Sequence, residues 1–241
     1  MMNYLWQKEY SLRAGDFDKF NRIKPSAVLE LFQDAAGQHA EEINVGYDAM
    51  TKRSYMWVLL KVKLKFISNP KTYQKVIIKT WPLKPNRVIY RREYSMENEN
   101  GECLIAGSSE WVVMHNEKRR LVADPKLYPF TEGFLTETIF EEKLDRVCDF
   151  EEKGTPRIVN AGFSEIDVNK HVNNTKYANY VLDAVVPDEK DVLAVFQIDY
   201  RKEVLEGTQL RIYHSAEEKE VLAKGLNDNG EIMFSCKLEY K

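Results

Sequence analysis

The chain has 241 residues, of which 44% are hydrophobic and 12% aromatic, enough to build the core of one large domain or two small ones. No apolar run approaches the ~20 residues that cross a bilayer, and the first residues lack the layout of a signal peptide, so we expect a cytoplasmic protein without a membrane span. The net charge is −3, and three scattered cysteines, Cys103, Cys148 and Cys236, argue against a disulfide framework and a zinc knuckle.

The first predicted element is an amphipathic helix that begins at Pro25. Apolar residues recur behind it with the spacing 0, 3, 4, 7 and 8, at Val28, Leu31, Phe32, Ala35 and Ala36. This spacing places them on one buried face of a helix. Proline suits the first turn because it lacks the backbone N–H that would have no partner there.

Four strands are predicted next, at residues 57–66, 76–81, 88–96 and 103–114. The first two, and the beginning of the third, lie within residues 49–92. This stretch holds twelve bases and no acid, so it carries +12 and the rest of the chain −15. The alternation of lysine with apolar residues in the first strand is typical of a solvated strand face, but it does not explain the missing acids. A basic surface on an acidic protein instead favours an anionic partner.

A second copy of this pattern begins 149 residues later, where Asp18 and the helix stripe have counterparts in Asp167, Tyr177, Tyr180, Val181, Ala184 and Val185. Asn-Gly pairs at positions 100–101 and 229–230 each predict a tight hairpin, because both residue types tolerate positive φ. The strands of the second copy are predicted at residues 193–203, 209–215, 221–226 and 232–240.

The repeat predicts an α+β fold with two tandem units, each a curved antiparallel sheet wrapped around one long central helix. Two such units that join edge to edge protect their exposed strand edges, so we expect them to pack as a pseudo-dimer. We assign residues 1–122 to the first unit, for substrate and carrier binding, and residues 156–241 to the second. Residues 123–155 are rich in Glu and Pro, have no counterpart in the repeat, and form the predicted linker.

The second copy opens with an acid, an amide and an imidazole on alternate positions. Asp167, Asn169 and His171 stand just before its helix, in IDVNKHVNNTKYANY. A calcium loop would need Gly and Glu where Val172 and Ala178 stand, and a catalytic zinc site would need further histidines at ligand spacing. We therefore expect neither a metal ion nor another cofactor.

Helix capping explains the Asn and Thr residues at positions 173–175. It does not explain the polar residues before them, because the first copy has Phe20 and Arg22 in place of the amide and the imidazole. A purely structural need would be expected in both copies, so we interpret the second copy as the chemical half. Since no cysteine adjoins the motif, we favour attack by water, assisted by carboxylates such as Glu203, over a cysteine nucleophile.

The stretch DVNKHVNNTKYANY resembles the signature Asp-x-Asn-x-His-Val-Asn-Asn-x-x-Tyr of the fatty acyl-carrier-protein thioesterases of bacteria and plant plastids. The resemblance covers nearly the whole chain, with WVLLKVKLKF in the first copy, DYRKEV after the second helix, and the tandem hotdog layout of that family. It implies that Asp167, Asn169, His171 and Glu203 are the catalytic set. Many plant members have Cys directly after the last acid, where this chain has Val204, which argues against a thiol nucleophile.

The reaction that this resemblance implies is hydrolysis of the thioester of fatty acyl-acyl carrier protein, with release of the free fatty acid, in fatty acid biosynthesis. Glu203 or Asp167 can activate water, and His171 can orient that carboxylate or protonate the leaving thiolate. The backbone N–H groups of Val172 and Asn173, near the expected start of the second helix, are candidates for an oxyanion site. Hydrolysis of acyl-coenzyme A and a non-catalytic hotdog protein that binds acyl chains or their carrier are the alternatives.

The resemblance also gives the basic stretch an interpretation, because the carrier is acidic and presents its acyl chain on a phosphopantetheine arm. We predict carrier docking by Lys84, Arg87, Arg91 and Arg92. Nucleic acid is a rival anion, but no nucleic-acid-binding motif supports it. The oligomeric state stays open, with a homodimer as one option.

Overall fold

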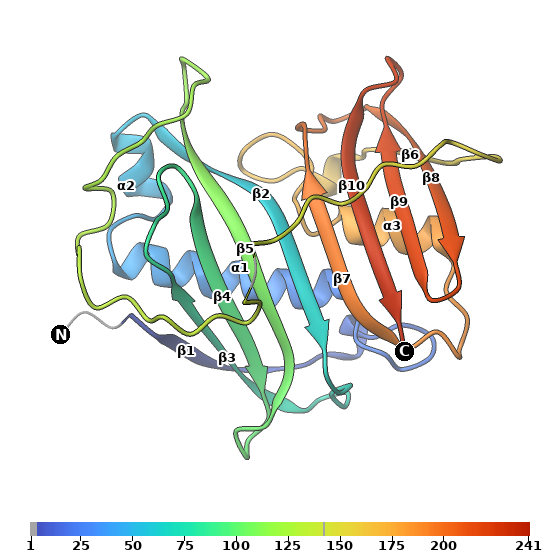
Figure 1. The fold of residues 1–241 in the computed structure, drawn as a ribbon, viewed down its shortest axis with the longest axis horizontal. Coiled ribbons are helices and arrows are strands. Elements are labelled where there is room, and N and C mark those ends of the chain that lie inside the picture. The colour runs from blue at the N-terminus through green and yellow to red at the C-terminus, as the bar shows by residue number, and fades with distance from the viewer. Residues whose placement is uncertain (1–3, 142) are drawn as a thin grey trace.

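The computed structural model describes residues 4–141 and 143–241, and within them ten strands form one antiparallel sheet (Figure 1). The first half of the chain contributes β1 (Trp6–Ser11), β2 (Tyr55–Phe66), β3 (Lys75–Pro82), β4 (Tyr90–Glu97) and β5 (Cys103–His115). The second half contributes β6 (Arg157–Asn160), β7 (Leu193–Tyr200), β8 (Gln209–Glu217), β9 (Glu220–Leu226) and β10 (Ile232–Tyr240). The eight strands predicted from sequence are confirmed, whereas the short edge strands β1 and β6 were missed.

The order of the strands shows the duplication directly. The sheet runs β1-β3-β4-β5-β2-β7-β10-β9-β8-β6, so each half has the same order when counted from the outer edge to the centre. The halves join through β2 and β7, which pair antiparallel from Lys61 opposite Asp199 to Lys65 opposite Val195. The predicted α+β pseudo-dimer of two hotdog units is confirmed.

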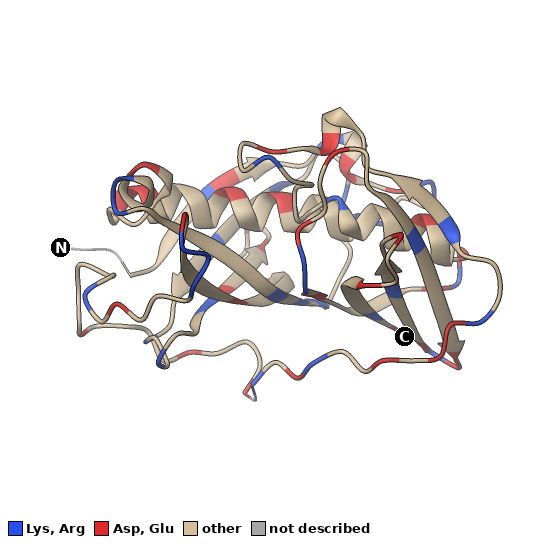
Figure 2. Cartoon of the chain, turned by 90° about the horizontal axis from the view of Figure 1, so that it is seen from above, with Lys and Arg blue, Asp and Glu red and all other residues tan. Residues whose placement is uncertain are grey.

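The helices cover one face of the sheet. They are α1 (Pro25–Glu42), α2 (Tyr47–Lys52) and α3 (Tyr177–Val185), with short 3-10 turns at Ala14–Asp16 and Phe163–Glu165. Seen from above, α1 and α3 lie on the same side of the sheet, and the segment that joins the halves crosses the opposite side (Figure 2). Among the described residues, none of the helices has the length and apolar character to cross a membrane.

The second central helix is half as long as the first, with 9 residues in α3 against 18 in α1. It ends at Val185 because Pro187 follows two residues later. Proline lacks the N–H that the next helical hydrogen bond needs and restricts the residue before it. Val186 adopts a left-handed conformation, φ 50°, and its N–H closes the helix on the carbonyl of Leu182.

The two units share one hydrophobic core instead of building one each. Apolar side chains on the helix-facing side of the sheet pack continuously from β1 in the first unit to β8 in the second, across the β2–β7 junction. Leu64 on β2 and Phe196 on β7 are fully buried cross-strand neighbours at that junction. A smaller aromatic cluster in the first unit, around Tyr90, Tyr128 and Met50, lies under α2 and the start of the joining segment.

The outer face of the sheet is polar, and residues 137–141 and 143–150 of the predicted linker lie across it (Figure 2). Polar side chains of the strands bind the backbone of the described part of this segment at several points. The N–H groups of Ile139 and Val147 donate to Glu93 and Asp199, while Lys61, Trp81, Arg91, Gln197 and Lys224 donate to backbone carbonyls of the segment. A segment without its own secondary structure can be buried only if its backbone groups find such partners.

Replacing Asp199 by Ala should lower the free energy of unfolding by about 1–3 kcal/mol, because the buried N–H of Val147 then loses its acceptor and the amide of Gln197 loses one of its two acceptors. Thermal or denaturant unfolding measures the change, and proteolysis near Val147 should become faster. Glu217→Ala on β8 is the control, since that side chain is exposed and should change stability by less than about 0.5 kcal/mol. Equal stabilities of the two variants would contradict the anchoring role of Asp199.

Candidate active site

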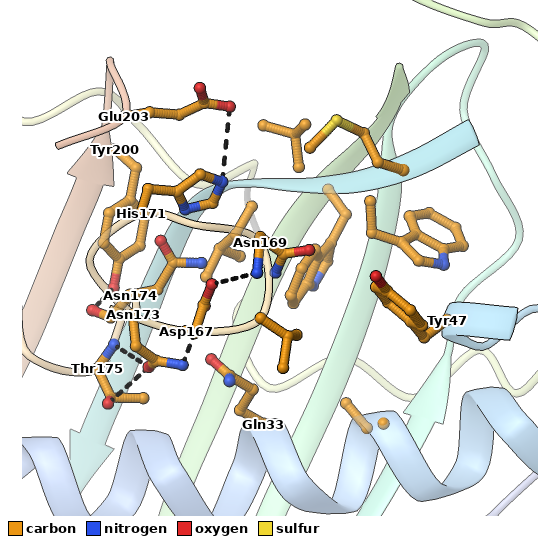
Figure 3. A pocket seen from close by; sticks show the side chains of 18 of the residues that line it. Gln33, Tyr47, Asp167, Asn169, His171, Asn173, Asn174, Thr175, Tyr200 and Glu203 are labelled. Atoms are coloured by element: carbon orange, nitrogen blue, oxygen red, sulfur yellow. Dashed lines mark hydrogen bonds and ion pairs between the residues drawn. The ribbon is translucent and has the colours of Figure 1, made fainter. Parts of the chain in front are cut away.

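A groove of about 1620 Å³ opens between the two units. Its lower wall is α1, its upper wall is the beginning of β2, and the loop before α3 closes one end (Figure 3). The first unit contributes apolar and aromatic side chains, among them Met50, Trp57 and Trp111, whereas the second unit contributes most of the charged and amide groups near the loop. A concave, largely apolar site with a few convergent polar groups is typical of a small-molecule binding site.

The loop that carries the motif is a tight turn built around Asp167. Its Oδ1 accepts the N–H of Asn169 at 2.8 Å, and its backbone carbonyl accepts the N–H of Lys170 at 2.9 Å. Lys170 has a positive φ of 69°, which reverses the chain so that the carbonyl of His171 can accept the N–H of Asp167. The turn thus presents Asn169 and His171 toward the groove from either side of Lys170 (Figure 3).

The first unit builds the same turn without the chemical residues. Asp18 Oδ1 accepts the N–H groups of Phe20 and Arg22, and Asn21 has a positive φ of 58° at the position of Lys170. Arg22, which stands at the position of His171, donates to Asp18 Oδ2 instead of facing a groove. The aspartate therefore has a structural task in both units, and only the amide and the imidazole are specific to the second.

His171 and Glu203 meet at the closed end of the groove (Figure 3). His171 Nε2 lies 3.7 Å from Glu203 Oε1, and within the described residues this buried nitrogen has no hydrogen-bond partner. The other oxygen of Glu203 accepts a hydrogen bond of 2.6 Å from Arg119, a residue of the first unit. Glu203 lies three residues beyond the end of β7, in a loop instead of the predicted strand.

The residues after the motif hold the loop in place. Asn173 donates from Nδ2 to Asp167 Oδ2 at 3.3 Å, and its Oδ1 accepts the N–H and the hydroxyl of Thr175. Tyr200 donates its hydroxyl to the carbonyl of Asn174 at 2.8 Å, and burial raises the pKa of Tyr200, so the phenol stays protonated and remains a donor. The Asn and Thr residues thus order the turn before α3, which itself begins at Tyr177 without a side-chain cap.

The predicted oxyanion donors are not available. The N–H of Val172 donates to the carbonyl of Val204 at 2.8 Å, and the N–H of Asn173 donates to the carbonyl of Glu165 at 2.9 Å. That prediction assumed a helix starting near Asn173, where the first N–H groups would be free. The helix starts four residues later, and the extended loop before it uses its backbone groups to bind neighbouring segments.

Two of the four predicted docking residues are not on the surface. Arg92 is 7% exposed beneath α1, where it donates to His39 and Thr80. Arg91 points to the outer face of the sheet, where it binds Glu93, Ser108 and the backbone of the joining segment. Successive residues of a strand face opposite sides of a sheet, so Arg92 is buried on the helix side and Arg91 is half-buried on the outer side. Lys84 and Arg87, in the turn between β3 and β4, are exposed.

The cysteines lie away from the groove, since none of them lines it. Cys236 is buried in β10, and burial raises the pKa of its thiol well above the usual value; burial also raises the pKa of Cys103. A thiolate is therefore disfavoured at both positions. Among the described residues, no group of three His, Cys, Asp or Glu side chains is arranged to hold a metal ion.

Two family models match the chain. The acyl-ACP thioesterase N-terminal domain, where ACP is acyl carrier protein, matches residues 3–126, and the acyl-ACP thioesterase C-terminal domain matches residues 151–241. The chain belongs to the acyl-ACP thioesterase family. The family resemblance inferred from the motif is confirmed.

Individual relatives of this family agree with that assignment. The chloroplastic palmitoyl-acyl carrier protein thioesterase of Cuphea hookeriana is 27% identical over 219 residues, which cover 83% of this chain and 52% of the relative. The chain thus spans about half the length of the curated relatives it matches. The solved acyl-ACP thioesterase from Bacteroides thetaiotaomicron has a TM-score of 0.87 at 20% identity, and the 12:0-ACP thioesterase from Umbellularia californica 0.85 at 22%, each covering 99% of this chain and 98% of the other. These structures confirm the fold.

One residue of the site was missed by sequence reasoning. Arg119 stands 84 residues before Glu203, in a basic turn, KRR, after β5. Nothing in its local pattern distinguishes it from its neighbours Lys118 and Arg120. Only the pairing of β2 with β7 brings this turn of the first unit next to the loop of the second.

Replacing Asp18 or Asp167 by Ala should lower the free energy of unfolding by about 1 kcal/mol or more, because each carboxylate holds the N–H groups of its own turn. The loss should be larger for Asp18→Ala, since Asp18 also binds the Arg22 side chain. Denaturant unfolding of both variants measures the two losses. An unchanged stability of Asp167→Ala would contradict the structural task of that carboxylate.

Proposed function

We propose that this acyl-ACP thioesterase family member hydrolyses the thioester of fatty acyl-ACP to free fatty acid and carrier. The observation that carries the proposal is the meeting of His171 and Glu203 at one end of a groove whose apolar wall comes from the other unit. The names of the relatives add support, since the Cuphea and Umbellularia proteins are named for palmitoyl- and 12:0-ACP.

The acyl chain would lie in the groove between α1 and β2. Its hydrocarbon would contact the aromatic and apolar side chains of the first unit, including Trp57 and Trp111, and gain by leaving water. The thioester carbonyl would then lie near the motif loop, beside His171 and Glu203. Binding energy along the chain would fix the reacting carbon at these groups.

The attacking group in this proposal is a water molecule held between Glu203 and His171. The carboxylate accepts the proton of the water as the oxygen bonds to the thioester carbon, and a tetrahedral intermediate forms. His171 Nε2 lies where it can orient the carboxylate or pass a proton to the leaving sulfur. Collapse of the intermediate breaks the carbon–sulfur bond, and the products are the fatty acid and the carrier thiol.

The negative charge on the carbonyl oxygen needs a donor other than the N–H groups of Val172 and Asn173, since both are already bound. The side-chain amide of Asn169 fits this task, because it is exposed at the groove and its own backbone N–H is fixed by Asp167. Asp167 then acts mainly by holding the turn. A preorganised amide donor of this kind stabilises the transition state more than the ground state.

The test is steady-state hydrolysis of acyl-ACP and acyl-coenzyme A substrates of several chain lengths. We expect the carrier substrates to be preferred, and Glu203→Ala and His171→Ala to lower kcat by at least ~100-fold. Asp167→Ala should lose more activity than Asp18→Ala, although both carboxylates hold the same kind of turn. A preference for coenzyme A would favour the alternative substrate, and full activity of Glu203→Ala would reject the proposed site.

Carrier docking is proposed for the exposed part of the basic stretch. The double reversal Lys84→Glu and Arg87→Glu should lower kcat/KM for acyl-ACP several-fold at low salt, because such charges steer an acidic partner and are screened over about 8–10 Å. The effect should disappear at high salt and be absent with a small acyl thioester that lacks the carrier. Equal losses with both substrates at every salt concentration would contradict a docking role for this turn.

A further inference from the structure

Glu203 needs an external anchor if it is to act in chemistry. It follows the end of β7 in a loop, and its side chain is 35% exposed, so packing alone does not fix its rotamer. The loop backbone is held, since the carbonyl of Met233 accepts the N–H groups of Arg201 and Lys202, and that of Val204 accepts the N–H of Val172. The backbone is therefore fixed on both sides of Glu203, while its carboxylate depends on side-chain contacts.

The guanidinium of Arg119 supplies such a contact from the other unit. Its Nη2 lies 2.6 Å from Glu203 Oε2, and its Nη1 lies 3.6 Å from Sδ of Met56 on β2. The turn that carries it is itself well fixed. The N–H of Arg119 donates to His115, the N–H of His115 to Arg120, and the N–H of Asn116 to Ser54.

This contact divides the two oxygens of Glu203 between two neighbours. Oε2 faces the guanidinium, and Oε1 is left to face His171 Nε2 at 3.7 Å. The pair contributes little to stability, because the side chain of Arg119 is 53% exposed and ion pairs in contact with water are weak. Its value lies in orientation, since a carboxylate that turns away from His171 no longer activates water in the right place.

We propose that Arg119 is a positioning residue that holds Glu203 in register with His171, so that the first unit completes the reaction centre of the second. This inference rests on the proposed function of Glu203 and His171 and goes beyond it. The residue does not touch the reacting atoms; it acts through the carboxylate. The first unit then contributes to the hydrolysis step, through Arg119, as well as to binding of the acyl chain.

The experiment compares Arg119→Ala and Arg119→Lys with the control Arg120→Ala. The Arg120 side chain is exposed and makes no hydrogen bond or ion pair with the residues that the structure describes. Arg119→Ala should lower kcat about 10- to 100-fold with KM changed less than about threefold, since misplacing a catalytic group affects turnover more than binding. Arg119→Lys should lower kcat less than Arg119→Ala does, and Arg120→Ala should have the kcat of the wild type. Millimolar guanidinium chloride should partly restore Arg119→Ala, with unchanged melting temperature in all three variants.

The double variant Arg119→Ala, Glu203→Ala separates positioning from other roles. If Arg119 acts through Glu203, removing it from the Glu203→Ala protein should cost nothing further. An equal loss in that background, or a rise in KM with unchanged kcat, would overturn the proposal, and the latter would point to recognition of an anionic group of the substrate. Full activity of Glu203→Ala alone would reject the proposed function, whereas an inactive Glu203→Ala beside a fully active Arg119→Ala would reject only the role of Arg119.

Discussion

The antiparallel pairing of β2 with β7 is the contact on which the rest of this structure depends. It turns two five-stranded sheets into one, removes the edge that each unit would otherwise expose, and makes the hydrophobic core continuous. It also places the beginning of β2 and the turn after β5 beside the motif loop of the second unit. The groove exists only at this junction, because its apolar wall and its polar end belong to different units.

The two units contain the same turn, but only the turn of the second unit carries the proposed catalytic side chains. In both units the segment before the helix contains a 3-10 turn, an aspartate that accepts the N–H two residues later, and a residue with positive φ. In the first unit, Arg22 donates to its own aspartate, Asp18, and also to the backbone carbonyls of Asp188 and Asp191 in the second unit. In the second unit, the His171 side chain faces Glu203 instead of the aspartate of its own turn. The backbone of the turn is retained, and Asn169 and His171 are the turn residues that supply the proposed chemistry in the second copy.

The structure gives many bases of residues 49–92 a role within the chain, whereas the sequence suggested that they bind an acidic partner. Several of its bases have partners within the chain: Lys61 and Arg91 bind the backbone of the joining segment, and Lys75 and Lys79 pair with Glu9 and Glu97. Buried Glu93 also serves that segment, although burial raises the pKa of its carboxyl. The absence of acids from residues 49–92 therefore reflects in part a need for donors to backbone carbonyls. Exposed bases of the stretch, among them Lys84 and Arg87 in the turn between β3 and β4, are left for a partner.

The sequence by itself determined the duplication, the eight longer strands, the first helix and the motif, because these depend on periodicity and turn chemistry within a few residues. Spacing placed the buried face of α1, and two Asn-Gly pairs marked the hairpins. The shortening of α3 before Pro187 was also readable in principle, since proline acts locally. The tertiary structure alone decided which N–H groups are free, which arginines are buried, and that Arg119 reaches Glu203. Those facts arise from contacts between residues far apart in the chain, and local patterns carry no information about which distant groups will pair.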